Sequence, residues 1–157
     1  MINDPLTATT PQLPVGVNGL KLDGRTLYFT NSAQNLLAQV DIDLKTGTAR
    51  GPASKIVNGL PPAVGYDDFA LDRKGNAYVT SAAGNFIERV DLRSGKQTIV
   101  AGAIDSTDIA EPTAAAFGRD GKEDILFVTT AGGLFFPVNG NTSVGGQVVA
   151  VKVGKKY

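Results

Sequence analysis

The sequence predicts an all-β protein made of about three units of four short antiparallel strands. Three observations lead to this prediction. Short apolar runs alternate with turns, and the 19 Gly and 8 Pro fall mainly at these breaks. The alternation recurs about every 50 residues, as in repeat architectures. Side chains at matching points also agree, because Tyr28 and Thr30 correspond to Tyr78 and Thr80.

The first 16 residues lack a clear period, so we expect residues 1–16 to form an extended lead-in. The first repeat is expected over residues 17–60. Its turns are predicted at Asp23-Gly24-Arg25 and at residues 45–47, because Gly readily adopts the positive φ that tight turns need. Its strands are expected at residues 17–22, 27–30, 36–42 and 55–57.

The second repeat is expected over residues 61–111 and has the same order, with polar turns at 72–76 and 93–96. Its strands are expected at residues 68–71, 77–80, 86–92 and 97–101. The third repeat is expected over residues 112–157. A Gly-rich insertion at 131–146 leaves little room for a fourth strand there. The strands of this repeat are expected at residues 113–117, 125–129 and 147–153.

Repeats of four short antiparallel strands are typical of the blades of a β-propeller. A plain β-sandwich with accidental internal similarity is the alternative. Known propellers have about four to eight blades, so three blades cannot close a ring. We therefore expect residues 1–157 to form one domain, half of a six-bladed propeller. The open blade faces would expose apolar surface, so we expect either a dimer of half-propellers or a missing N-terminal half to cover them.

The composition excludes several kinds of chemistry. The chain has no Cys and no His, which excludes disulfides, thiol nucleophiles, imidazole metal ligands and a Ser-His-Asp triad. Any bound metal must therefore be a cation held by oxygen ligands.

The charge and hydropathy exclude some partners. Fifteen basic and fifteen acidic residues give a formal net charge of zero, so we expect no nucleic-acid surface. No apolar run approaches the roughly 18 residues needed to cross a bilayer. Residues 1–5 have neither the positive region nor the apolar core of a signal peptide, so cytoplasmic localisation is the default expectation.

Three stretches carry a resemblance to a known family. They are Asn18-Gly19-Leu20, Asp67-Asp68-Phe69, and residues 112–118 leading into residues 126–130. Together they resemble the SMP-30/gluconolactonase/LRE-like family, with the chain similar to the C-terminal half of its members and most similar to fungal ones. The resemblance implies a six-bladed propeller, in many members a lactonase or related ester hydrolase with a divalent cation at the ring centre.

The resemblance also implies roles for individual residues. Asn18 and Asp67 match positions that contribute to the central cation site, with Ca²⁺ the expected ion and Mg²⁺ or Zn²⁺ as alternatives; oxygen ligands independently suit Ca²⁺ and Mg²⁺. Asp67 and Asp68 are the expected catalytic carboxylates, with Asp68 orienting the attacking water. Tyr66, beside this pair, and Thr113, at the equivalent point of the third repeat, are expected to contact a small-molecule substrate. The simpler alternative is that these side chains cap turns, pack, or bond to local backbone.

Three functions remain open at this point. The first is cation-assisted hydrolysis of a lactone or ester. The second is a metal-independent cyclase of the hetero-Diels–Alder type, which would act by positioning its reactants. A few fungal members of the family that act in secondary metabolism resemble such cyclases. The third is a non-catalytic binding or assembly module.

Overall fold

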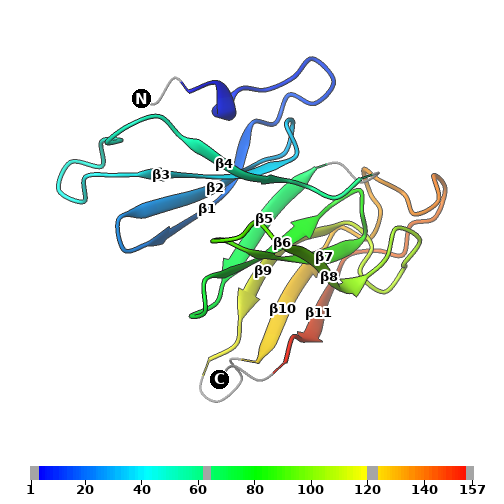
Figure 1. Cartoon of the computed structure of the whole chain (residues 1–157). Coiled ribbons are helices and arrows are strands. Elements are labelled where there is room, and N and C mark those ends of the chain that lie inside the picture. Colours follow the sequence, from blue (N-terminus) through cyan, green and yellow to red (C-terminus); the bar gives the residue numbers. More distant parts are fainter. Residues whose placement is uncertain (1–3, 62–64, 120–123, 155–157) are drawn as a thin grey trace.

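The computed structural model describes residues 4–61, 65–119 and 124–154 and arranges them in three antiparallel sheets (Figure 1). The first sheet, in the order β1-β2-β3-β4, comprises β1 (Val17–Asp23), β2 (Thr26–Asn31), β3 (Leu36–Asp41) and β4 (Ser54–Asn58). The second, β5-β6-β7-β8, comprises β5 (Tyr66–Leu71), β6 (Asn76–Ser81), β7 (Phe86–Asp91) and β8 (Gln97–Gly102). The third, β11-β10-β9, comprises β9 (Pro112–Phe117), β10 (Ile125–Thr130) and β11 (Gln147–Lys152). A short 3-10 helix, η1 (Pro5–Thr7), precedes β1.

This architecture confirms the prediction of an all-β chain with three repeated antiparallel sheets. Two sheets have the four expected strands, whereas the third has three in the part of the chain that the structure describes. The long connection at residues 131–146 joins β10 to β11 where a short hairpin would otherwise lie. Within the described ranges, no helix has the length and hydropathy of a membrane span.

The innermost strand of each sheet is irregular near its start. Pairing with the neighbouring strand shifts between Val17 and Leu20 in β1 and between Tyr66 and Phe69 in β5. The pairing of β9 with β10 shifts at the corresponding place, beside Thr113. A β-bulge re-aims the side chains that it contains and is common next to functional sites. Strand β5 begins at Tyr66, so Asp67 and Asp68 belong to it. The sequence pattern placed Asp67 ahead of this strand.

Strand β6 of the middle sheet is buried on both faces, and this explains its nearly continuous run of apolar and small residues. Ala77 and Val79 of β6 pack toward the first sheet, and Tyr78 between them packs toward the third. The Tyr78 ring meets Phe117 edge-on, with ring centroids 5.2 Å apart. Alternation along one strand thus joins all three sheets through the core.

Two asparagines tie each sheet to the next. Asn35 Oδ1 accepts a hydrogen bond from the Tyr66 backbone N–H at 3.1 Å, and Asn85 Oδ1 accepts one from the Glu111 N–H at 2.9 Å. Both asparagines adopt a positive φ, which Asn tolerates better than most residues. These bonds hold the starts of β5 and β9 against the sheet that precedes each of them.

A buried carboxyl group lies in the middle sheet. Glu88 in β7 is 0% exposed; its Oε1 accepts a hydrogen bond from Gln97 Nε2, and its Oε2 has no hydrogen-bond partner. Burial raises the pKa of Glu88, and hydrogen bonds from Tyr66 and Gln97 oppose the rise. Folding therefore disfavours the ionised form of Glu88 relative to the unfolded chain.

Replacing Glu88 with Gln is expected to flatten the pH dependence of folding stability. A carboxyl whose pKa is raised by folding contributes stability at pH below its unfolded pKa, and that contribution is lost as the pH rises through the folded pKa. Glu88→Gln mimics the protonated form, so the free energy of unfolding of the variant should improve relative to the unsubstituted chain as the pH rises from 4 to 8. Urea unfolding at several pH values measures this. Asp105→Asn, an exposed carboxyl, is the control, and a difference that does not change with pH would contradict the assignment.

Candidate functional site

The three bulges bring residues of three different repeats together. Strand β5 contacts both β1 and β9, so the innermost strands lie side by side (Figure 1). Asn18 in β1, Asp67 in β5 and Thr113 in β9 all line one pocket. Residues 95 positions apart in the sequence, from 18 to 113, thus meet because each is the bulged residue of its inner strand.

The pocket has a volume of about 350 Å³ and opens to solvent, a size that suits a small organic ligand. Its polar side chains come mainly from the inner strands and the residues beside them. They are Asn18, Ser32, Asp67, Glu111 and Thr113. The remaining walls are apolar and come largely from two connections, the lead-in before β1 and the β10–β11 connection.

Asp67 is a pocket carboxyl group with a raised pKa. Burial raises its pKa to about 6, and repulsion from the carboxylates of Asp68 and Glu111 adds to the rise, whereas a side-chain hydrogen bond from Asn18 opposes it. A carboxyl group in a pocket, with its pKa raised by burial and by like charges, is a typical feature of a functional site.

Asp68 does not line the pocket, contrary to the expectation that it orients an attacking water. Its carboxylate forms an ion pair with Lys21 Nζ at 2.5 Å. Strands β1 and β5 approach closely here, and a Cβ at Gly19 would lie 2.7 Å from the Asp68 Cα. The close approach brings the Lys21 ammonium to Asp68, so this carboxylate links two sheets.

The structure also corrects the expectation for Tyr66. The side chain is 0% exposed and is absent from the pocket lining. Its hydroxyl lies 3.4 Å from Gln97 Nε2, in the buried group that contains Glu88. Adjacent residues of a strand point to opposite faces, so Tyr66 packs between sheets while Asp67 faces the pocket.

Thr113 lines the pocket, and its hydroxyl already has partners. Its Oγ1 donates to the Thr129 backbone oxygen at 3.2 Å and lies 2.9 Å from Thr129 Oγ1. The side chain therefore contributes chiefly to the shape of the pocket.

Glu111 is a site residue that the sequence analysis missed. It directly precedes β9, is 3% exposed, and has a φ of 52°. Its Oε2 accepts hydrogen bonds from the backbone N–H groups of Phe135 at 2.9 Å and Phe136 at 3.4 Å. In the sequence, Glu111 is only a single acidic residue before the proline that begins β9. Its role depends on the β10–β11 connection, which folds over it and is distant in the sequence.

The pocket contains oxygen donors of the kind that bind the divalent cation implied by the family resemblance. Asp67 and Glu111 supply carboxylates, and Asn18 supplies an amide whose Nδ2 donates to Ser32 Oγ at 3.0 Å, leaving Oδ1 for a ligand. These oxygen atoms fit Ca²⁺ or Mg²⁺ better than Zn²⁺, which prefers nitrogen and sulfur. The described residues contain no cluster of three or more acidic side chains that could hold an ion, so water or another chain segment must supply further ligands.

The family model for the SMP-30/Gluconolactonase/LRE-like region matches residues 12–132. That span contains every candidate residue discussed above except the Phe135-Phe136 pair. No curated protein sequence matches the chain.

Solved structures with this fold include three with informative names. A luciferin-regenerating enzyme has a TM-score of 0.71 at 21% identity, covering 89% of this chain and 46% of that one. Regucalcin from Agrobacterium tumefaciens, a calcium-binding protein, has a TM-score of 0.55 at 24% identity and coverages of 72% and 37%. A gluconolactonase from Xanthomonas campestris has a TM-score of 0.52 at 19% identity and coverages of 71% and 34%. The chain spans less than half the length of each, and the likeness is consistent with the predicted partial propeller.

Proposed function

The chain belongs to the SMP-30/gluconolactonase/LRE-like family, and from this premise we propose that it forms part of an enzyme that hydrolyses a small lactone or ester in the pocket of the inner strands. The observation that carries the proposal is the convergence of Asn18, Asp67 and Glu111 on one pocket. A gluconolactonase among the structures of the same fold supports the reaction class.

The proposal includes a divalent cation, with Ca²⁺ preferred because the donors are oxygen atoms. Asn18 Oδ1 and the Asp67 carboxylate would hold it, and Glu111 lies close enough to add to the negative potential that attracts it. When bound, such a cation polarises a substrate carbonyl and lowers the pKa of water. Ser32 orients the Asn18 amide, and Thr113 limits where the substrate ring can lie.

Calorimetric titration of the chain with Ca²⁺, Mg²⁺ and Zn²⁺ tests the cation. We expect Ca²⁺ to bind, Mg²⁺ to bind more weakly, and Asn18→Ala to weaken Ca²⁺ binding by about tenfold through loss of one oxygen ligand. Asn141→Ala, an exposed residue of the β10–β11 connection outside the pocket lining, is the matched control. Failure of Ca²⁺ and the other ions to bind would contradict the cation-assisted mechanism and leave the metal-independent cyclase as the alternative.

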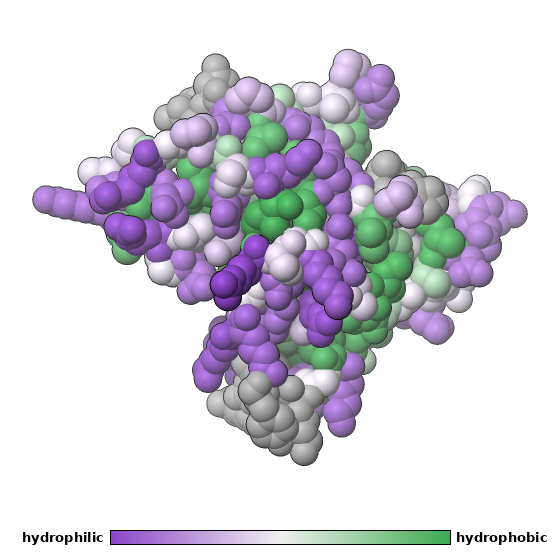
Figure 2. All heavy atoms as spheres, viewed as in Figure 1, coloured by the Kyte–Doolittle hydropathy of each residue, from purple (hydrophilic) through white to green (hydrophobic). Residues whose placement is uncertain are grey.

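The outward faces of the two outer sheets carry exposed apolar side chains. Leu20 and Leu22 of β1 are 53% and 52% exposed, and Val148 of β11 is 72% exposed. The surface in Figure 2 has apolar patches among mostly hydrophilic residues. We propose that a second copy of the chain covers these faces and so supplies the blades that close the ring, since two copies have about the length of a whole six-bladed propeller.

Sedimentation measures this association directly. The expected species is a dimer of the 16.3 kDa chain, and Leu22→Lys is expected to shift it toward monomer because a charge would be buried at the interface. Leu44→Lys, in the hairpin after β3, is the control. A stable monomer at high concentration would contradict the second copy and leave the faces to another segment or partner.

A further inference from the structure

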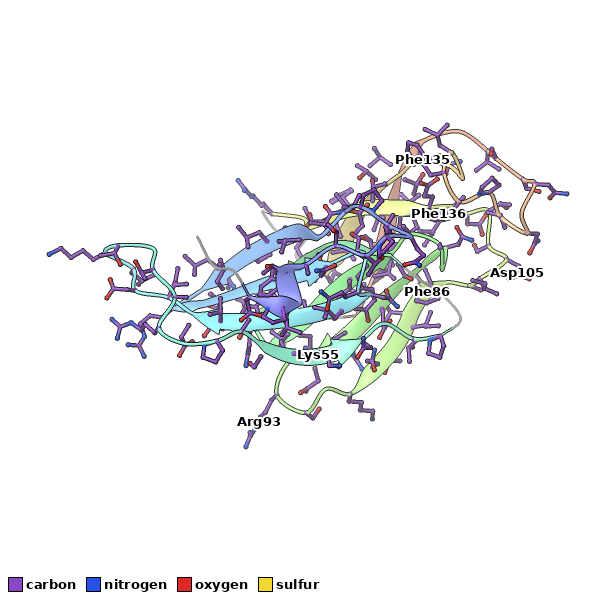
Figure 3. The ribbon with its side chains drawn as sticks, turned by 90° about the horizontal axis from the view of Figure 1, so that it is seen from above. Lys55, Phe86, Arg93, Asp105, Phe135 and Phe136 are labelled. Atoms are coloured by element: carbon purple, nitrogen blue, oxygen red, sulfur yellow. The ribbon has the colours of Figure 1, made fainter. Side chains whose placement is uncertain are left out.

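The pocket has an apolar side as well as a polar one. Phe135 and Phe136 lie near each other in the β10–β11 connection (Figure 3), and both line the pocket. Leu13 and Val15 of the lead-in line it as well. Phe135 is 76% exposed and Val15 is 43% exposed, so the rim presents open apolar surface.

Specific hydrogen bonds hold the β10–β11 connection, which carries Phe135 and Phe136, in place. Glu111 Oε2 accepts from the backbone N–H groups of both phenylalanines, as described above. Ser143 Oγ donates to the Gly133 oxygen at 2.7 Å, and the Val144 N–H donates to the Gly132 oxygen at 2.8 Å. The connection is thus tied to itself and to the residue that precedes β9, which fixes the backbone that carries the two rings.

The polar side chains of the pocket are mostly committed to the protein. Ser32 Oγ donates to the Tyr66 oxygen and accepts from Asn18, and Thr113 Oγ1 bonds to Thr129. Glu111 uses Oε2 for backbone groups. The Asp67 carboxylate, which accepts a hydrogen bond from Asn18, and the Asn18 Oδ1 therefore carry most of the hydrogen-bonding capacity that remains. A ligand hydroxyl that leaves water against the apolar walls finds no partner there, which costs about 1–3 kcal/mol for each such group.

We propose that the ligand of this pocket carries a hydrocarbon group, so that the substrate is an alkyl- or aryl-substituted lactone or ester and not a polyhydroxylated one. This inference rests on the proposed hydrolase function. The carbonyl end faces Asn18 and Asp67, and the hydrocarbon lies against Phe135, Phe136 and the lead-in. Phe135 and Phe136 are specificity-determining residues, and Glu111 is a positioning residue that acts through them.

Binding of ligands that cannot be hydrolysed separates this inference from the reaction itself. The probes are cyclopentanone and 2-pentylcyclopentanone, titrated into the full chain by calorimetry. We expect the pentyl group to tighten binding by about tenfold or more, because several methylene groups leave water. Phe135→Ala and Phe136→Leu should reduce that gain, whereas Leu44→Ala, an exposed apolar residue of the β3–β4 hairpin, should preserve it.

Hydrolysis assays with γ-nonalactone and D-glucono-δ-lactone complete the test. Faster hydrolysis of the nonalactone, with a rise in KM in Phe135→Ala, supports the inference. Faster hydrolysis of the gluconolactone, or a pentyl group that adds no affinity, overturns the hydrocarbon preference and leaves the hydrolase proposal intact. Hydrolysis of neither lactone, with the pentyl probe still bound through Phe135, refutes the hydrolase proposal and retains the apolar ligand class. Failure of every probe to bind and react overturns both.

Discussion

Replacing Asp67 with Asn is expected to lower kcat/KM for a lactone or ester substrate by about 100-fold or more, the usual scale for loss of a group acting directly at the reacting centre. Asn has nearly the same shape but lacks the charge that attracts a cation and the capacity to take a proton. The substitution therefore tests the chemistry of the carboxylate and leaves the bulge of β5 in place.

The same substitution is expected to leave stability unchanged or to increase it. Burial and two neighbouring carboxylates raise the pKa of Asp67 to about 6, so its ionised form is unfavourable in the folded protein. A raised carboxyl pKa means that stability is lost as the pH rises through 6, and Asn removes this loss. Thermal unfolding at pH 5 and pH 8, without added cation, should show a relative gain for the variant at pH 8.

The control for this prediction is Asp23→Asn. Asp23 is an exposed carboxyl at the end of β1, directly before the Gly24-Arg25 turn, where Asn is also a common residue. It removes the same charge without touching the pocket. Activity of Asp67→Asn within about twofold of the control would refute the assigned role. Loss of activity together with a clear loss of stability would point to a structural role instead.

Replacing Phe69 with Ala is expected to lower the free energy of unfolding by about 3–5 kcal/mol. Phe69 is 0% exposed and packs with Leu37, Val57 and Val79 between the first two sheets. The Lys21 Nζ also lies 5.2 Å from the centre of its ring. The substitution leaves a cavity at the junction of the sheets, and a domain with a total stability of about 5–15 kcal/mol tolerates such a loss poorly.

Urea unfolding measures this effect, and Phe135→Ala is the matched control. The same atoms are removed there, but Phe135 is 76% exposed, so its replacement should change stability by less than about 0.5 kcal/mol. Equal effects of the two substitutions would contradict the assignment of Phe69 to the core. Because Phe69 lies two residues from Asp67 on β5, the variant should also lose ligand binding as the inner strand loosens.

The sequence was enough to predict the eleven described strands. It also predicted three of the five polar side chains that line the pocket. Strand position depends on local features, the alternation of apolar residues and the Gly or Asn of each turn, and both are visible in a short window. The repeat then related Asn18, Asp67 and Thr113 to one another, because residues at the same position of successive repeats occupy equivalent positions in the structure. These three side chains do line one pocket.

Only the tertiary structure decided which neighbours of those residues belong to the site. The bulge in β5 sends Asp67 to the pocket and buries Tyr66 between sheets, and a shift of one residue reverses the face of a strand. Asp68 pairs with Lys21, 47 positions away, and Glu111 meets a connection 24 positions later. Such long-range contacts depend on how the sheets pack, and local sequence patterns do not encode that packing.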